Sequence, residues 1–378
     1  SFFDFKRWVN VKDRKKNENF IIFDIAAASQ AIADSGWQPN GDEERARTGV
    51  VIGSGIGGLE GIYDASISLY KNGPRRVTPF FIPSTLINLV SGQVSIRFGY
   101  RGPNHAVATA CSSGSHAIGD AARLIQLDNA DVMIAGGSEA ALCRIGIAGF
   151  ASARALASKF NDKPEQASRP WDRDRDGFVM GEGAGCVVLK RLEDAIRDGD
   201  EIYSVIRGIG ASSDGRGKGI TAPSIRGQKQ AVMRAYQQAG YSATSVELIE
   251  AHGTSTKVGD ATELSTLAEV YSDRSNGDNV AVGSVKSQIG HLKAAAGMAG
   301  LLKASLALHH RTIPPSAGFE QPNTSVNSSS LSQWPRLAYY VRSTRHALSL
   351  FNHAAADSPL SWAYRDPCAK GEACRARL

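Results

Sequence analysis

The sequence has little cysteine, and none of it is paired in the way that metal or disulfide sites usually require. Five cysteines occur among 378 residues, and no two of them are spaced as Cys-x-x-Cys. An odd count without such pairs disfavours a disulfide framework and a zinc site. We therefore expect no bound metal and a reducing compartment, which predicts a cytoplasmic protein.

Two other absences exclude broad classes of function. No apolar run approaches the length of about 20 residues that a membrane-spanning helix needs, and no signal peptide is visible. No long block of lysine and arginine with interleaved aromatic residues occurs, so a nucleic acid is not an expected partner. The net charge of +6 suits an acidic protein partner or an anionic surface instead.

What the sequence does contain is an alternation of short apolar runs and amphipathic stretches. The apolar runs end in or near glycine, are too short for helices and too continuous for one-sided strands, and lie at residues 48–55, 131–140, 185–192, 203–213, 246–254 and 279–287. The longer stretches predict helices at residues 20–37, 113–128, 225–240 and 290–310. Strands that alternate with helices predict an α/β fold.

The rhythm of strand, turn and helix in the first half of the chain recurs after residue 203, which indicates two similar halves. We divide the chain at RDGD into an N-terminal half, residues 1–200, and a C-terminal half, residues 201–325. Residues 326–378 lose the pattern of glycine-ended strands, and we expect this tail to be poorly structured.

A lone cysteine stands on a sharp strand-to-helix turn in VATACSSGSHAIGDAARLI, residues 107–125. Cys111 would sit at a helix N-terminus, where unpaired N–H groups and the helix dipole favour a thiolate. Its own backbone N–H would also point at a developing oxyanion, as in a nucleophile elbow. From this turn alone, a buried structural cysteine is an equal alternative.

Two histidines and a lysine also follow predicted strands. His252 comes just past a buried strand in EAHGTST, and His291 stands at a glycine turn in KSQIGH, five residues after Lys286. Active sites of α/β folds gather at the carboxyl ends of strands. A single histidine there is usually a structural hydrogen-bonding residue, but this set together with Cys111 predicts an active site.

One cysteine, two neutral histidines and a lysine suit acyl transfer followed by carbon–carbon bond formation. The thiolate takes an acyl group as a thioester, the imidazoles stabilise an enolate oxygen or move protons, and the lysine supplies fixed positive charge or orients its neighbours. A cysteine protease is the alternative, but it uses a single histidine with an Asn or Asp orienter, so the second histidine has no role there.

Two further features have competing interpretations. The loop SGIGG (54–58) lacks a complete nucleotide-binding pattern, so we interpret it as a close backbone approach or a wall beside a binding pocket. Asp260 and Glu263 follow His252 closely. They would be either a helix cap with a first-turn charge or partners that orient Lys286, and we favour the second interpretation.

The motifs themselves resemble a known family. ATACSSG, EAHGTSTKVGD and KSQIGHLKAAAG are similar, in this order, to the three signature blocks of the β-ketoacyl-[acyl-carrier-protein] synthases, the condensing enzymes of fatty acid and polyketide synthesis. GSGIGG, PFFIPSTLIN, GYRGPN and ASRPWDRDRDGFVMGEGAG agree with this resemblance. The resemblance covers residues 1–320 and points to the elongating, type 2 enzymes. Three blocks in the same order are specific for this family, whereas any one block alone is not.

The resemblance implies a thiolase-like fold, a layered α-β-α-β-α sandwich of two similar halves, and a homodimer. It implies that Cys111 receives an acyl group from a carrier protein, that malonyl carrier protein is decarboxylated, and that its carbanion attacks the thioester. His252 and His291 would support the decarboxylation and stabilise the enolate, and Lys286 would hold the electrostatics of the site. No cofactor is implied, because the substrates are carried on the phosphopantetheine of acyl carrier protein.

The resemblance also assigns binding roles. Thr254 and Thr256 match residues that hydrogen-bond the phosphopantetheine arm, and Ile56 matches a position that lines the acyl pocket. Arg75 and Arg76 lie where the family meets its carrier. Carrier proteins are acidic, so this basic pair suits docking; a solvated loop is the alternative.

Departures from the family pattern leave other functions open. The family's first strand is missing from the start of the chain, and the late GFGGTN loop, which gates the cysteine and completes the oxyanion hole, is not found in the tail. An inactive or scaffolding homologue is therefore the alternative function, although such partners lack the motif cysteine. A thiolase that uses free coenzyme A would need a second cysteine in a late glycine-rich loop, and neither Cys368 nor Cys374 has that context.

Overall fold

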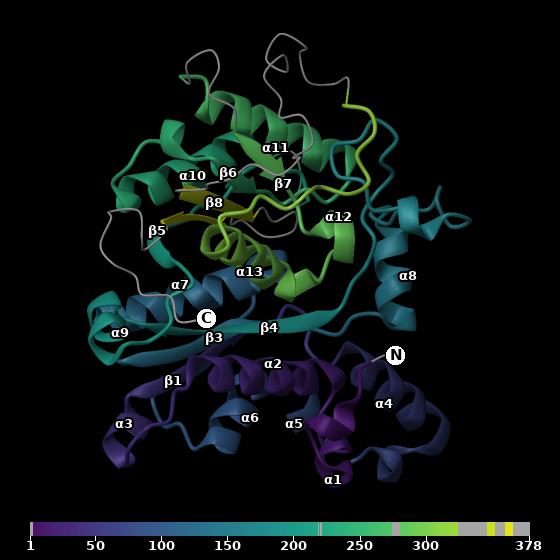
Figure 1. The fold of residues 1–378 in the computed structure, drawn as a ribbon. Helices are drawn as coiled ribbons and strands as arrows, with labels where there is room; N and C mark the ends of the chain where they lie inside the picture. Colours follow the sequence, from purple (N-terminus) through teal and green to yellow (C-terminus); the bar gives the residue numbers. More distant parts are fainter. Residues whose placement is uncertain are drawn as a thin grey trace. The chain divides into compact units, whose positions relative to one another are not determined.

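The computed structural model describes residues 3–217, 219, 221–273, 280–323, 346–351 and 360–365, the last two ranges by their backbone alone (Figure 1). The chain forms two compact units, of which the first comprises residues 1–156, 180–200 and 291–298 and the second comprises residues 157–179, 201–290 and 299–378. The chain passes from the first unit to the second at several points, and one of these points follows residue 200. The sequence analysis did not anticipate the other points. The division into domains at 1–200, 201–325 and 326–378 stays a prediction.

The first unit is built on a four-stranded sheet with the order β2-β1-β3-β4. Its strands are β1 (Thr48–Gly53), β2 (Asn104–Val107), β3 (Val132–Glu139) and β4 (Gly183–Lys190). β1 pairs in parallel with β2 and β3, and β3 pairs antiparallel with β4. The helices that belong to this part of the chain are α1 (Val11–Arg14), α2 (Asn19–Ser35), α3 (Asp42–Ala46), α4 (Leu59–Asn72), α5 (Phe81–Thr85), α6 (Leu89–Phe98), α7 (Ser113–Gln126), α8 (Arg144–Ser152) and α9 (Leu192–Asp198).

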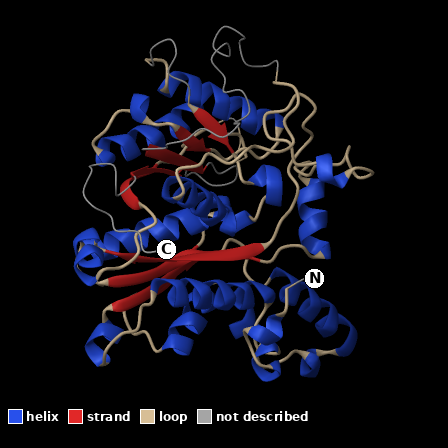
Figure 2. Cartoon of the chain, viewed as in Figure 1, coloured by secondary structure: helices blue, strands red, loops and turns tan. Residues whose placement is uncertain are grey.

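Apolar residues at helical spacing bury α2 against this sheet. Phe20, Ile25 and Ile32 of α2 lie in one core cluster with Ile52 of β1, and each buried side chain of this size contributes roughly 1.5–3 kcal/mol. α2 ends at Ser35 and is capped by Gly36, whose φ of 65° is a left-handed conformation that glycine adopts without strain. Figure 2 shows α2 and α7 on opposite faces of the sheet, so both of its faces are covered within this unit.

The second unit is built on a five-stranded sheet with the order β5-β9-β8-β6-β7. Its strands are β5 (Val205–Ala211), β6 (Leu248–Glu250), β7 (Ala281–Gly283), β8 (His346–Phe351) and β9 (Leu360–Arg365), and its helices include α10 (Ile225–Ala239), α11 (Lys257–Val270) and α12 (Lys286–Ile289). α10 lies against β5 because Gly208 and Gly210 have no side chains: a Cβ on Gly210 would stand 1.9 Å from the Ala231 carbonyl oxygen. Within the described part of the chain, the last helix is α13 (Ala296–His309).

The two sheets repeat one pattern. In the second, β6 pairs in parallel with β7 and β8, and β8 pairs antiparallel with β9; these are the relations that β1 has with β2 and β3, and β3 with β4. Each central strand is also followed by a turn that carries residues of the predicted site. The α/β class and the two similar halves expected from the sequence are therefore confirmed.

The sequence analysis did not predict β8 and β9, which lie in the tail that we expected to be poorly structured. They stand between β6 and β5, so the tail fills the middle of the second sheet. Such short segments become strands only by pairing with distant partners, and local pattern does not reveal this. Among the described residues, no helix has both the length and the apolar character needed to cross a bilayer.

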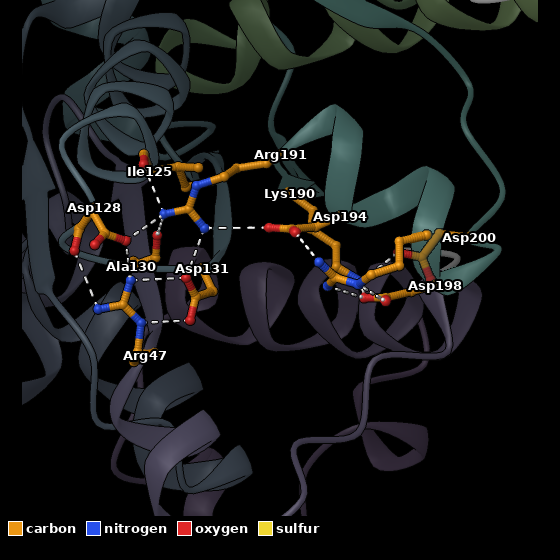
Figure 3. A network of polar contacts seen from close by, with 11 residues as sticks. Arg47, Ile125, Asp128, Ala130, Asp131, Lys190, Arg191, Asp194, Asp198 and Asp200 are labelled. Atoms are coloured by element: carbon orange, nitrogen blue, oxygen red, sulfur yellow. Dashed lines mark hydrogen bonds and ion pairs between the residues drawn. The ribbon is translucent and has the colours of Figure 1, made fainter.

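A network of ion pairs joins one end of the first sheet (Figure 3). Arg47 precedes β1 and Arg191 follows β4, and both bind Asp131, which precedes β3, at 2.5 Å and 2.7 Å. Both guanidinium groups also reach Asp128. The hydrogen bond from Arg47 is the main cause that lowers the pKa of Asp131 to about 2. The network thus ties together the ends of three strands.

Asp24 is a carboxyl group in the core of the first unit. It lies on α2, is fully buried, and its Oδ1 accepts a hydrogen bond from the thiol of Cys186 on β4 at 3.2 Å. Burial raises the pKa of Asp24 to about 7, against the opposing effect of this hydrogen bond. Burial also raises the pKa of the Cys186 thiol well above its usual value, so this cysteine is a structural residue.

We predict that Asp24→Asn removes a pH-dependent loss of stability. The pKa of Asp24 is higher in the folded than in the unfolded chain, so its stabilising contribution is complete below 3.8 and is lost as the pH rises through about 7. Urea unfolding measures the free energy of unfolding at pH 5 and at pH 8. The decrease in this free energy from pH 5 to pH 8 should be smaller for Asp24→Asn than for the parent chain. Asp120→Asn, at the surface of α7, should keep the parental difference; an unchanged difference in Asp24→Asn would contradict the prediction.

Candidate active site

Cys111 stands on a short 3-10 turn between β2 and α7, the Cys111 turn (Ala110–Ser112). Ala110 has a φ of 48°, in the left-handed region that residues other than glycine rarely occupy. α7 starts at Ser113 and is 14 residues long, and the first N–H groups of such a helix have no acceptor within it. The strained turn therefore places the thiol immediately before a helix N-terminus.

Side-chain hydrogen bonds hold this turn in place. The Ser113 hydroxyl accepts from the Thr109 N–H at 2.9 Å and donates to the Ala110 carbonyl at 2.6 Å. Thr109 Oγ1 is also hydrogen-bonded to His116 Nδ1 of α7 at 2.7 Å. Burial lowers the pKa of His116 and so favours its neutral ring, which can share a proton with Thr109. The strain at Ala110 is thereby offset by bonds on both sides of Cys111.

His291 belongs to the same unit, and the turn that follows it packs on the Cys111 turn. The approach is close: a Cβ on Gly114 of α7 would stand 2.8 Å from the Ala294 carbonyl oxygen. The backbone N–H of Lys293 donates to His291 Nδ1 at 3.0 Å. A neutral His291 ring therefore carries its proton on Nε2, which makes that nitrogen the donor toward a ligand.

Lys293 is a functional candidate that the sequence analysis missed. It is buried, has a φ of 55°, and its Nζ donates to the His291 carbonyl at 3.3 Å. The same ammonium group lies 4.8 Å from the ring centroid of Phe150, a cation–π contact. A single lysine inside a stretch otherwise rich in alanine and glycine was the signal that pointed to it.

His252 and Lys286 belong to the second unit, where they follow β6 and β7. The Glu263 carboxylate of α11 accepts the N–H groups of His252 at 2.7 Å and Gly253 at 2.9 Å. The Ser284 hydroxyl donates to the His252 carbonyl and accepts the N–H of Lys286. These bonds join the segments after the two neighbouring strands, so His252 and Lys286 are held in one polar cluster.

Asp260 supports the same backbone from another side. It accepts the N–H groups of Ser255 at 3.1 Å and Trp171 at 2.7 Å, and it forms an ion pair with Arg175 at 3.4 Å. Burial raises the pKa of Asp260 to about 7 and also raises that of Glu263, which the positive charge of Lys286 lowers in part. Asp260 lies in the first turn of α11, as one of the two sequence interpretations expected, but Thr256 occupies the N-cap position. The interpretation that Asp260 and Glu263 orient Lys286 stays a prediction.

The other predicted site residues lie on turns. Thr254 and Thr256 are hydrogen-bonded to each other through their hydroxyl groups at 2.9 Å. Ile56 is half-buried on the loop after β1, and Arg75 and Arg76 are exposed on a 3-10 turn after α4. The structure thus groups Cys111 with His291 in one unit and His252 with Lys286 in the other. Cys368 and Cys374 lie outside the described residues.

The loop after β1 is occupied by a side chain of the protein itself. Glu139, at the end of β3, is 1% exposed, and it accepts the N–H groups of Gly55, Ile56 and Gly57 and the hydroxyl of Ser54. The amides that a phosphate would need are already bound, which agrees with our interpretation against nucleotide binding. The sequence analysis missed Glu139, although an acidic residue at the end of a continuous apolar strand was a usable signal.

We predict that Glu263→Gln destabilises the chain by about 2 kcal/mol, because an amide turns one acceptor into a donor facing the N–H groups of His252 and Gly253. Urea denaturation at pH 7 measures the change. Glu269→Gln on the same helix is the matched control, since Glu269 is exposed and bound to Lys229, and it should change stability by less than about 0.5 kcal/mol. Equal losses in the two variants would disprove the role assigned to Glu263.

Comparisons with known proteins identify the family of the chain. The protein-family model of the beta-ketoacyl synthase N-terminal domain matches residues 7–195, and the family model of the C-terminal domain matches residues 203–320. The chain is 50% identical over 318 residues to "3-oxoacyl-[acyl-carrier-protein] synthase 2" of Rhizobium meliloti (strain 1021), covering 84% of this chain and 74% of the relative.

Two further comparisons extend to another organism and to a solved structure. The chain is 43% identical over 323 residues to the mitochondrial 3-oxoacyl-[acyl-carrier-protein] synthase of Arabidopsis thaliana, covering 85% of this chain and 69% of the relative. The crystal structure of a beta-ketoacyl synthase from Burkholderia phymatum STM815 matches with a TM-score of 0.84 at 27% identity, covering 95% of this chain and 85% of that one. The thiolase-like fold class and the resemblance seen in the signature blocks are thereby confirmed, and the chain belongs to the beta-ketoacyl synthase family.

Proposed function

We propose that this chain catalyses a decarboxylating condensation that elongates an acyl chain, as a 3-oxoacyl-[acyl-carrier-protein] synthase. The observation that carries the proposal is the Cys111 turn, which places a thiol before the N-terminus of α7 and beside the segment of His291. Relatives at 50% and 43% identity are named for this activity. The substrates would be an acyl thioester and malonyl-acyl-carrier-protein.

The first step transfers the acyl group to Cys111. The thiolate attacks the carbonyl carbon of the incoming thioester, the tetrahedral intermediate collapses, and the phosphopantetheine thiol leaves. The positive end of α7 favours the thiolate. In this proposal the backbone N–H of Cys111 donates to the oxyanion, since such donors stabilise the intermediate by several kcal/mol.

The second step forms the carbon–carbon bond. Malonyl-acyl-carrier-protein loses carbon dioxide, and the electron pair of the broken bond passes into an enolate. Nε2–H of His291 and the imidazole of His252 donate to the enolate oxygen. The enolate carbon then attacks the thioester on Cys111, and the thiolate of Cys111 leaves as the new 3-oxoacyl chain departs on its carrier.

Other residues act through binding and electrostatics in this proposal. Lys286 supplies positive charge next to the His252 segment, and the Glu263 and Asp260 carboxyl groups keep that segment in place. Thr254 and Thr256 hydrogen-bond the phosphopantetheine arm. No dissociable cofactor takes part, because both substrates arrive on the carrier.

The proposed partners are acyl carrier protein and a second copy of the chain. Arg75 and Arg76 are exposed and would meet the acidic carrier. Exposed apolar side chains on α4, α5 and α8, which include Leu69, Ile82 and Ile147, are of the kind that a homodimer covers. The cytoplasmic location stays a prediction from the cysteine content.

We predict that Cys111→Ala abolishes acylation. Intact-mass spectrometry after incubation with an acyl-carrier thioester should show one acyl adduct on the parent chain and none on Cys111→Ala. Cys143→Ala, which removes a buried thiol, should keep the adduct. No adduct on a folded parent chain would disprove the proposed activity and favour the inactive or scaffolding homologue.

We predict that reversing Arg75 and Arg76 to glutamate weakens carrier docking. The KM for acyl carrier protein should rise about tenfold at low salt with kcat nearly unchanged, because the change acts on encounter rather than on chemistry. The rise should shrink at high salt. A double reversal of Arg216 and Arg226, exposed residues of the second unit, is the matched control; the same rise there would show that net charge, not this turn, is responsible.

A further inference from the structure

The loop Ser54–Gly57 after β1 is an anion nest that holds a carboxylate of the chain. Glu139 Oε2 accepts the Gly55 N–H at 2.9 Å, both carboxylate oxygens lie 3.2 Å from the Ile56 nitrogen, and Oε1 accepts the Gly57 N–H at 3.1 Å. Successive N–H groups that converge in this way form a concave site for negative charge. All of these bonds are buried or half-buried, so the loop conformation depends on them.

This loop lies directly against the Cys111 turn. A Cβ on Gly55 would stand 3.4 Å from the Cα of Ala110, the strained residue before Cys111, and 2.9 Å from Glu139 Oε2. On its other side, a Cβ on Gly57 would stand 2.7 Å from the carbonyl oxygen of Thr85 at the end of α5. The backbone of the loop is thus packed closely between the Cys111 turn and α5.

We propose that Glu139 is a positioning residue that holds the loop Ser54–Gly57 against the Cys111 turn and so sets which acyl chains reach the thiol. The loop carries Ile56, and it packs against Ala110, the residue directly before Cys111. The inference rests on the proposed function for the identity of the chains, but the geometry of the loop stands without it.

The chemistry of Glu139 explains why this role needs a carboxylate. Three backbone donors and one hydroxyl converge on two oxygens, and a carboxylate has acceptor sites for all of them. An amide would present an N–H group to the nest and leave a buried backbone donor unpaired. The loop then has to move away from the side-chain amide of the glutamine at position 139. A shift of about 1 Å beside a reacting atom changes reaction rates strongly.

The test compares Glu139→Gln with Asp24→Asn, in which an equally buried carboxyl group of the same unit becomes an amide without touching the loop. Each chain is labelled with N-ethylmaleimide and with N-dodecylmaleimide, and mass spectrometry of peptides gives the labelling rate at Cys111. Cys186 is buried, so its labelling reports unfolding in the same sample.

The measured quantity is the rate of labelling at Cys111 by N-dodecylmaleimide divided by the rate with N-ethylmaleimide. We expect this ratio to rise about fivefold in Glu139→Gln while Cys186 stays unlabelled. Asp24→Asn should keep the parental ratio. A folded Glu139→Gln with the parental ratio would overturn the proposal, because a purely structural role changes the folded fraction and not the preference for chain length. Should Glu139→Gln label at Cys186, Glu139→Asp takes its place, and the same criterion applies.

A second measurement separates this proposal from the proposed function. Acyl transfer from short- and long-chain acyl carrier protein should show the same change in the ratio of kcat/KM for Glu139→Gln. If the parent chain accepts no acyl group, the proposed function fails, and the maleimide ratio still decides the role of Glu139. If the parent chain is acylated and both ratios stay parental, only the role of Glu139 is disproved.

Discussion

The structure depends on buried carboxylates that bind the backbone N–H groups of loops leaving the sheets. Glu139 binds the loop after β1, and Glu263 binds the turn after β6. Glu250, in an ion pair with Lys303, accepts the N–H of Val285 after β7. A loop turned away from water has to satisfy its amides inside the protein, and a carboxylate does so for two or three amides at once.

Contacts from neighbouring residues and segments also hold strained backbone at the turns of the proposed site. Ala110, Ser255 and Lys293 all have positive φ although none is glycine. Each lies within two residues of a residue of the proposed site, and each is held by hydrogen bonds or close packing. Strain of this kind persists only where the surroundings determine the conformation more strongly than the local preference does.

Much of the fold followed from periodicity and from glycine. The predicted helices at 20–37, 113–128 and 225–240 match α2, α7 and α10 within two residues at either end, and all six predicted strands exist. The helix predicted at 290–310 begins only at Ala296, since His291 to Ala295 form a bridge and a 3-10 turn that place His291 beside Met180. Local apolar content cannot distinguish this turn from a helix, because its shape comes from packing against the Cys111 turn.

By itself the sequence determined the family, the residues of its signature blocks, and the position of Cys111 before a helix, because each of these is local in the chain. Only the tertiary structure decided which groups support them. Glu139 stands 82 residues from Gly57, and β8 and β9 reach the second sheet from the far end of the chain. Such partners are chosen by three-dimensional packing and by the cost of leaving a buried amide unpaired, and neither depends on distance along the sequence.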